Sequence, residues 1–305
     1  MQRVLITGGM GQVGSYIAEE LGRENEVIVL DNFTSNAINK LPNVTIIKGD
    51  VRDLKILRKL FRELDIDIII HCAAQISVTK SLTNPLYDLQ VNTIGTLNLL
   101  SAAKNLNLSR FIYFSSAAVY GMPKYLPIDE EHSVNPISPY GASKLAGEKY
   151  CQVFYHIYGL PVVCLRPFNI YSPRQKVENP YSGVICRFID RVKKGEPPVI
   201  EGDGTQTRDF ISVYDVVRFT LLAMRKQKAI GQVYNVGTGK PTMIKALAAE
   251  IIEIAGKKLK PVYTKPREGD IKQSYADIRK AKSLGFKPKV NLREGLRELI
   301  KMQVN

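Results

Sequence analysis

Short apolar segments that alternate with helical ones constrain the fold of this chain more than any other feature. Six β-branched or aromatic runs cover residues 3–9, 26–31, 44–50, 67–74, 110–116 and 161–169. Helical periodicity covers residues 12–23, 53–63, 86–104 and 140–158. Strands that are apolar throughout are buried on both faces, which is typical of a parallel sheet covered by helices. We therefore predict an α/β fold with a doubly wound parallel sheet.

The composition of the chain changes after about residue 170. Proline, glycine and charge become frequent in YSPRQ, KKGEPPVIEGDGTQTRDF and YTKPREGD, and helical segments are fewer. We predict a dinucleotide-binding sheet domain over 1–170, to which a later segment of about 208–240 returns. A smaller, mixed α/β region over 171–305 is expected to bind the substrate. In doubly wound sheets the ligand crevice lies at the carboxyl edge, where the strand order reverses.

Composition argues against several other classes of protein. No run approaches the ~20 apolar residues that span a bilayer, and the chain enters its first strand almost at once, which predicts no signal peptide. Four scattered cysteines without a CxxC pair favour reduced thiols in the cytoplasm, and three scattered histidines predict no metal site. The net charge of +14 suits a phosphate-bearing small ligand. Because the lysines are dispersed, nucleic-acid binding is only a minor alternative.

The segment TGGMGQVGS follows the first strand and opens the first helix. Its glycines allow a tight turn, close approach of the backbone to a pyrophosphate, and packing of helix on strand. These glycines are Gly8, Gly11 and Gly14. Asp31 ends the second strand, where its carboxylate can accept hydrogen bonds from both ribose hydroxyls and would repel a 2′-phosphate. We predict a Rossmann-type site for NAD rather than NADP, with Asp50 and Val51 near the adenine.

The segment SPYGASK carries Tyr140 and Lys144 at the start of a predicted helix. Their spacing of four places both side chains on one face. A free tyrosine has a pKa near ~10, but a neighbouring ammonium and the positive ring of oxidised NAD would lower it. Tyr140 is therefore predicted to act as the general base for a sugar hydroxyl while hydride leaves the same carbon. Ser116, in SSAAVYG, would hold that hydroxyl.

Eight motifs occur in order along nearly the whole chain. They are TGGMGQVGS, HCAAQ, SSAAVYG, SPYGASK, RPFNIYSPRQ, GDGTQTRDFISVYDV, YNVGTG and PREGD. Together they resemble the extended short-chain dehydrogenase/reductases that act on nucleotide sugars, and above all the UDP-glucose 4-epimerases. The resemblance implies an isomerase with resident NAD, a UDP-sugar substrate, and a homodimer formed through the helices at 86–104 and 140–158.

The resemblance also implies roles for individual residues. Ser116, Tyr140 and Lys144 would form the catalytic triad. The residues implied at NAD, besides the glycines, are Gln12, Val13, Asp31, Asn32, Phe33, Thr34, Ser35, Asn36, Asp50, Val51, Cys72, Ala73, Ala74, Gln75, Tyr140, Lys144 and Phe168. The residues implied at the substrate are Ser116, Asn169, Arg208, Arg267 and Ser274. The planar fork of an arginine suits phosphate oxygens, and a serine at 274 would leave room for an N-acetyl group.

The two alanines after Ser116 distinguish between relatives. By the same resemblance, 4,6-dehydratases and nucleotide-sugar decarboxylases place acidic residues in this stretch, because they must move additional protons. Ala117 and Ala118 can move none. The prediction is 4-epimerisation of a UDP-hexose through a 4-keto intermediate, on UDP-glucose and UDP-galactose and also on their N-acetyl forms. Two alternatives remain: a 4,6-dehydratase or 4-ketosugar reductase of the same fold, and a non-catalytic NAD- or RNA-binding protein.

Overall fold

The computed structural model describes residues 1–305 except 35–37, 39, 176–182, 267–268 and 303–305. Its centre is a seven-stranded parallel sheet. From one edge to the other the strands are β11 (Val233–Val236), β6 (Val162–Pro167), β5 (Arg110–Phe114), β4 (Ile68–His71), β1 (Arg3–Thr7), β2 (Glu26–Asp31) and β3 (Val44–Lys48). The order reverses beside β1, so the predicted doubly wound fold is confirmed. β11 comes from the later segment of the chain.

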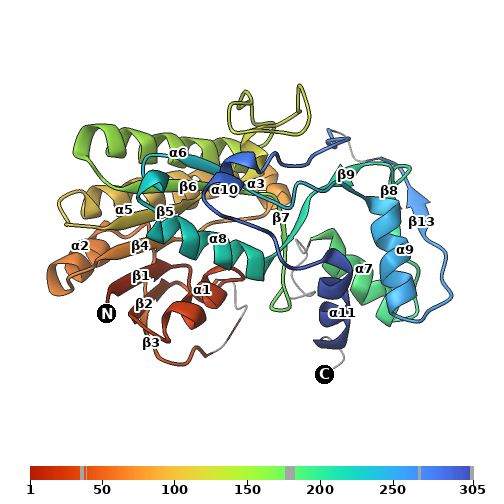
Figure 1. The fold of residues 1–305 in the computed structure, drawn as a ribbon, viewed down its shortest axis with the longest axis horizontal. Coiled ribbons are helices and arrows are strands. Elements are labelled where there is room, and N and C mark those ends of the chain that lie inside the picture. Colours follow the sequence, from red (N-terminus) through yellow and green to blue (C-terminus); the bar gives the residue numbers. More distant parts are fainter. Residues whose placement is uncertain (35–37, 39, 176–182, 267–268, 303–305) are drawn as a thin grey trace.

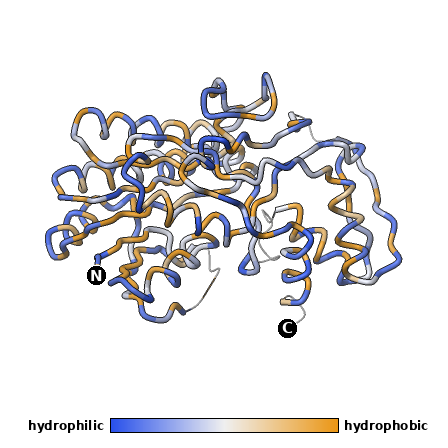
Figure 2. Tube along the Cα trace, viewed as in Figure 1, coloured by the Kyte–Doolittle hydropathy of each residue, from blue (hydrophilic) through white to orange (hydrophobic). Residues whose placement is uncertain are grey.

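Helices cover both faces of this sheet (Figure 1). One face carries α1 (Gly14–Leu21), α8 (Val213–Arg225) and the short α10 (Arg279–Ser283), and the other carries α2 (Leu54–Glu63), α5 (Gly95–Ala103) and α6 (Pro139–Tyr158). In β1, Val4 and Ile6 pack into one hydrophobic cluster and Leu5 into the other. This burial on both sides explains why the strands are apolar throughout, as the hydrophobic colouring along them in Figure 2 shows.

A smaller region lies beyond the sheet (Figure 1). Its helices are α7 (Val184–Lys193), α9 (Ile244–Ile254) and α11 (Leu292–Met302). Its strands are β7 (Asn169–Tyr171), β8 (Val199–Glu201), β9 (Thr207–Arg208), β10 (Phe210–Ser212), β12 (Thr242–Met243) and β13 (Val262–Thr264), which pair as β10–β7, β12–β9 and β13–β8. A separate cluster of buried residues, including Ile189, Ile200, Leu247 and Leu296, holds this region together. No helix in the described part of the chain is long and apolar enough to cross a membrane.

The predicted helix at 86–104 is interrupted in the structure. After α3 (Val78–Thr83), the chain forms α4 (Pro85–Leu89), a π-helical turn over Gln90–Ile94, and then α5. In this turn the Asn92 amide accepts a hydrogen bond from the N–H of Gln75 at 2.8 Å and donates one to its carbonyl at 2.9 Å. Periodicity of apolar residues could not reveal the interruption, because the partner of Asn92 lies beyond β4. π-Turns of this kind are frequent at functional sites.

Candidate active site

The turn after β5 presents Ser116. This residue caps a 3₁₀ turn over Ala117–Val119, and its hydroxyl accepts a hydrogen bond from the N–H of Ala118 at 3.1 Å. The methyl group of Ala117 packs against the hydrophobic cluster on the α1 and α8 face. The two alanines therefore shape the turn that carries the serine, and their side chains bring no group that could exchange a proton.

Local signals fix the start of α6. The hydroxyl of Ser138 accepts a hydrogen bond from the N–H of Gly141 at 3.1 Å, and Pro139 takes the first helical position, where no donor is needed. Tyr140 and Lys144 follow on the first two turns. The side chains of Tyr140 and Ser116 face each other, and the serine hydroxyl lies close enough to lower the pKa of the phenol. The structure thus brings the predicted serine and tyrosine together, with Lys144 one helical turn away.

Burial shifts the pKa values of Tyr140 and Lys144 in opposite directions. It raises the pKa of the half-buried Tyr140 above its ordinary value of 10.0, while the neighbouring Ser116 side chain acts to lower this pKa and the negative charge of Asp88 raises it further. Burial also lowers the pKa of Lys144 to about 8. The lysine is only 3% exposed, and its Nζ lies 4.7 Å from the centre of the Tyr113 ring. The expected lowering of the Tyr140 pKa by Lys144 is not found in the chain alone, because the lysine, with its pKa lowered to about 8, loses its charge before the phenol ionises.

The glycine-rich turn fits a pyrophosphate. Gly8 has φ +69°, and a Cβ atom on it would lie 2.6 Å from the backbone nitrogen of Ala73. A Cβ atom on Gly14 would lie 2.3 Å from the carbonyl oxygen of Gly8. Both positions therefore require glycine. α1 begins after Val13 without a side-chain cap, which leaves N–H groups at its N-terminus for a phosphate.

Asp31 ties the end of β2 to this turn. Its carboxylate accepts hydrogen bonds from the N–H groups of Met10, at 2.9 Å, and Phe33, at 2.8 Å. Asp31 is only 7% exposed. A carboxylate oxygen accepts more than one hydrogen bond, so Asp31 keeps capacity for the hydroxyls of a ribose. The residues present here fit NAD.

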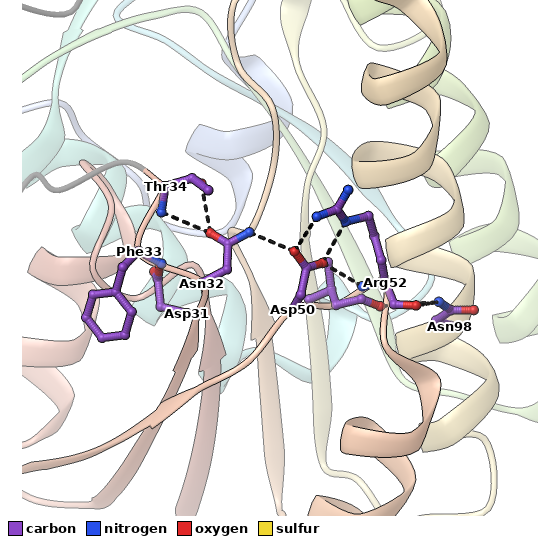
Figure 3. A network of polar contacts seen from close by, with 8 residues as sticks. Asp31, Asn32, Phe33, Thr34, Asp50, Arg52 and Asn98 are labelled. Carbon is purple, nitrogen blue, oxygen red and sulfur yellow. Dashed lines mark hydrogen bonds and ion pairs between the residues drawn. The ribbon is translucent and has the colours of Figure 1, made fainter.

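A second network lies between the ends of β2 and β3. Figure 3 shows Asn32 donating to the carboxylate of Asp50, at 2.8 Å, which Arg52 contacts from the other side at 2.9 and 2.7 Å. The hydrogen bond from Arg52 is the largest cause that lowers the pKa of Asp50, to about 2. Sequence analysis identified Asn32 and Asp50 but not Arg52. Its position directly after the GDV segment was an available signal.

The other residues predicted at NAD follow the carboxyl ends of the strands. Gln12 lies in the glycine-rich turn, and its amide donates to Gln175 at 3.4 Å. Val51 follows β3, residues 72–75 follow β4, and Phe168 follows β6. Thr34 donates to Asn32 at 2.7 Å through its hydroxyl. Ser35 and Asn36 lie outside the described residues.

Three residues predicted at the substrate gather around β9 and the neighbouring β7. Asn169 opens β7, and its N–H donates to the carbonyl of Asp209 at 2.9 Å. Ser274 donates its N–H to the carbonyl of Thr207 at 3.2 Å, beside Arg208. The Arg208 guanidinium forms an ion pair with Asp270 at 2.5 Å. Arg267, the second predicted arginine, lies outside the described residues.

The sequence did not identify Asp209, which organises this part of the site. Its buried carboxylate accepts hydrogen bonds from Thr238 through both the N–H, at 2.9 Å, and the hydroxyl, at 2.6 Å. It also accepts the N–H groups of Gly239, at 2.9 Å, and Ala276, at 3.2 Å. Asp209 therefore joins the YNVGTG loop to the segment that contains Ser274 and Ala276.

Comparisons with known proteins agree with this geometry. Residues 4–237 match the model of the NAD dependent epimerase/dehydratase family. The structure of UDP-glucose 4-epimerase from Thermotoga maritima with UDP-glucose is 37% identical, with a TM-score of 0.95, and the match covers 99% of this chain and 98% of that one. UDP-N-acetylglucosamine 4-epimerase from Methanobrevibacter ruminantium, in complex with UDP-N-acetylmuramic acid, is 38% identical, with a TM-score of 0.94 and the same two coverages.

A third similar structure contains the cofactor. UDP-glucose 4-epimerase from Thermus thermophilus in complex with NAD is 36% identical, with a TM-score of 0.90, and the match covers 98% of each chain. These relatives are isomerases, and the predicted family, enzyme class and cofactor are confirmed. The sheet, the glycine-rich turn and the matched sequence together place this chain in the NAD dependent epimerase/dehydratase family.

Proposed function

We propose that this chain is a NAD-dependent UDP-sugar 4-epimerase that interconverts UDP-glucose and UDP-galactose. The observation that carries the proposal is the close approach of Ser116 and Tyr140 at the edge of the sheet that also holds the glycine-rich turn, where Gly141 of α6 packs against the backbone of Ala118. Lys144 lies one helical turn beyond the tyrosine. Similar chains named UDP-glucose 4-epimerases support the same assignment.

In the proposed mechanism, NAD held by the glycine-rich turn and Asp31 would supply reversible hydride transfer at C4 of the sugar. Ser116 holds the C4 hydroxyl. Tyr140 takes the proton of that hydroxyl on its phenolic oxygen, and gives it back when the C4–H bond re-forms. Because the buried phenol resists ionisation, it requires positive charge nearby, and the Lys144 ammonium is the cation that the chain contributes.

The alanines at 117 and 118 favour the epimerase over the dehydratase. Elimination of water across C5 and C6 requires one group to take a proton and another to give one. The methyl groups of Ala117 and Ala118 can do neither. Asp31 supports resident NAD over a consumed NADPH, since its carboxylate lies at the end of β2 and would repel a 2′-phosphate. This argues against the ketosugar reductase.

Substrate breadth is part of the same proposal. The side chain of Ser274 is small, half-buried, and adjacent to the strand that carries Arg208. A serine leaves space that a larger side chain would fill. One similar chain is named a UDP-N-acetylglucosamine 4-epimerase. We expect this enzyme to accept UDP-N-acetylglucosamine and UDP-N-acetylgalactosamine as well.

The test is incubation of the purified protein with UDP-galactose without added cofactor, followed by chromatography of the nucleotide sugars. We expect UDP-glucose, and the N-acetyl pair to interconvert in parallel reactions. A 4-keto-6-deoxy product would instead indicate a dehydratase, and an absolute requirement for NADPH a reductase. Absence of turnover together with tight RNA binding would favour the non-catalytic alternative.

We also propose that the protein is a homodimer that pairs through α4 and α6. Leu86 is 63% and Ile157 is 70% exposed on these helices. Between the two helices lies a groove of about 550 Å³ that is lined largely by apolar side chains, including Leu89 and Ala146. Exposed apolar surface of this kind marks contact sites. Sedimentation should give the mass of two chains, and Ile157→Glu should reduce it to one.

We propose a cytoplasmic location. The thiols of Cys151 and Cys164 are close enough to influence each other's pKa, and neither forms a disulfide. Neighbouring free thiols suit a reducing compartment. Fractionation of cells that produce the protein should recover it with the cytoplasmic markers, and recovery with secreted proteins would contradict the proposal.

A further inference from the structure

Asp88 is a buried carboxylate for which the proposed mechanism has no role. It lies on α4, is 0% exposed, and forms no ion pair with a lysine, arginine or histidine among the described residues. Its oxygens accept hydrogen bonds from the Gln75 amide at 2.6 Å, from the Asn92 amide at 3.2 Å, and from the hydroxyl of Ser143. All three donors are neutral. A buried carboxylate with only neutral partners is costly unless a positive charge lies nearby.

These hydrogen bonds connect Asp88 directly to the first turns of α6. The hydroxyl oxygen of Ser143, which precedes Lys144, also lies 3.0 Å from the carbonyl oxygen of Tyr140. The hydroxyl of Thr93 donates to the carbonyl of Ser143 at 3.1 Å. The Asp88 carboxylate is therefore bonded to the helical segment that carries both the predicted base and its lysine. A substitution of Asp88 would therefore affect the positions of Tyr140 and Lys144 through one residue, Ser143.

Among the described charged and titratable groups around Lys144, Asp88 is the negative charge that is not paired with another cation. The groups that face the ammonium are His71 and Cys72 beside β4, Tyr113 of β5, Cys151 and Glu148 of α6, and Asp88 of α4. Burial lowers the pKa of His71 to about 3 and raises that of Cys72 to about 12, so both are neutral. Glu148 is paired with Arg166 through two hydrogen bonds, at 3.0 and 2.6 Å.

We propose that Asp88 is a positioning residue that fixes the first turns of α6 and balances the charge of the Lys144 ammonium in the active site. This inference rests on the proposed function, in which Tyr140 and Lys144 act on the sugar. Its electrostatic part is supported by the effect of the Asp88 charge, which raises the pKa of both residues. Asp88 itself has no contact with the reacting atoms in this proposal.

The decisive variant is Asp88→Asn, which removes the charge and keeps an oxygen for the two amides. In the NAD-loaded enzyme the positive nicotinamide ring lowers the pKa of Tyr140, so the pH profile of kcat should have an acid limb from Tyr140 and an alkaline limb from Lys144. Removing one negative charge lowers both pKa values, so both limbs should move to lower pH by roughly half a unit or more. A role confined to structure would lower kcat and leave the limbs in place.

Three further variants complete the test. Ser143→Ala keeps the charge and removes the bond to α6, so kcat should fall with unmoved limbs. Glu253→Gln removes one exposed negative charge from the distant α9 (Figure 1), and should reproduce the wild-type profile. Asp88→Ser removes the charge without introducing an amide, so it serves if Asp88→Asn does not fold. Unmoved limbs in the Asp88 variants, an equal shift in Glu253→Gln, or loss of folding in both Asp88 variants would each overturn the proposal.

An independent measurement separates this inference from the proposed function. Lysines labelled with ¹³C at Cε can be titrated by NMR in the NAD-loaded protein, and Lys144→Arg assigns the signal. The pKa of Lys144 should be lower in Asp88→Asn than in the wild type. If the wild type turns over no UDP-sugar, the proposed function fails while this titration still decides whether Asp88 balances the lysine. An unchanged titration in an active enzyme would overturn the Asp88 inference alone.

Discussion

A Cβ atom on Gly141 would lie 2.6 Å from the carbonyl oxygen of Ala118. α6 and the turn after β5 therefore touch through their backbones, and this contact brings Tyr140 to Ser116. The neighbouring residue on α6, Ala142, is exposed, so this position does not require a glycine.

We expect Gly141→Ala to lower kcat by roughly 10- to 100-fold, because a shift of about 1 Å at a catalytic group has a cost of that order. Overpacking should also reduce the free energy of unfolding by about 1–3 kcal/mol. Ala142→Gly is the matched control. It should lose about 1 kcal/mol through helix propensity and keep its kcat. Steady-state kinetics and urea unfolding of both variants give the answer, and equal kcat values would refute the expectation.

Tyr140→Phe should reduce kcat by about 10²- to 10⁴-fold, since it removes the proposed general base. Phenylalanine fills the same volume, so the free energy of unfolding should change little. The amount of NAD carried by the purified protein, measured from its absorbance, should also stay close to that of the wild type. Substantial turnover by this variant would show that another group moves the proton.

Lys144→Met should remove activity and also remove the pH dependence that Lys144 gives to the stability of the fold. The folded-state pKa of Lys144 is lowered to about 8 from 10.5. The unfolded chain therefore binds more protons between these values, and the stability of the wild type rises with pH across this window. Desolvation of the buried ammonium costs about 3 kcal/mol below pH 8. Unfolding of both proteins from pH 6 to 11 should show that the wild type gains about this amount relative to the variant between pH 8 and 10.5.

Arg166→Met should reduce the free energy of unfolding by about 3–5 kcal/mol, because it leaves the fully buried carboxylate of Glu148 without its partner. Arg166 also donates to the Tyr120 hydroxyl at 2.9 Å, and that bond would be lost as well. Replacing both partners, as in Arg166→Met with Glu148→Leu, should recover much of the loss. If the double variant were less stable than Arg166→Met alone, the Arg166–Glu148 pair would have to stabilise the fold by more than the mutual neutralisation of its two charges.

The predicted helices and strands of the sheet domain agree with the structure to within a few residues at most boundaries. α2 begins at Leu54, directly after its cap Asp53, and α6 covers 139–158 where 140–158 was predicted. These elements are set by local signals, namely caps and apolar periodicity. The interruption of the 86–104 helix was missed, because it depends on the hydrogen bonds between Asn92 and Gln75. The predicted sixth strand also divides, at Phe168, into β6 and β7.

The predicted roles of the site residues remain predictions, but their placement is informative. Sequence motifs identified the residues that end strands or open helices, among them Asp31, Ser116 and Tyr140. They did not identify Asp88 or Asp209, whose importance comes from partners on other elements. A buried acid in an otherwise ordinary helix or strand carries no local signal, because its donors are distant in sequence.

The sequence by itself determined the alternating elements, the glycine-rich turn and the candidate catalytic set. Each of these depends on the order of neighbouring residues, through backbone propensity and side-chain periodicity. Only the tertiary structure decided the protonation of the site. Burial raises the pKa of Tyr140 and lowers that of Lys144. Desolvation and charge depend on which atoms surround a group in space, and sequence order does not specify those atoms.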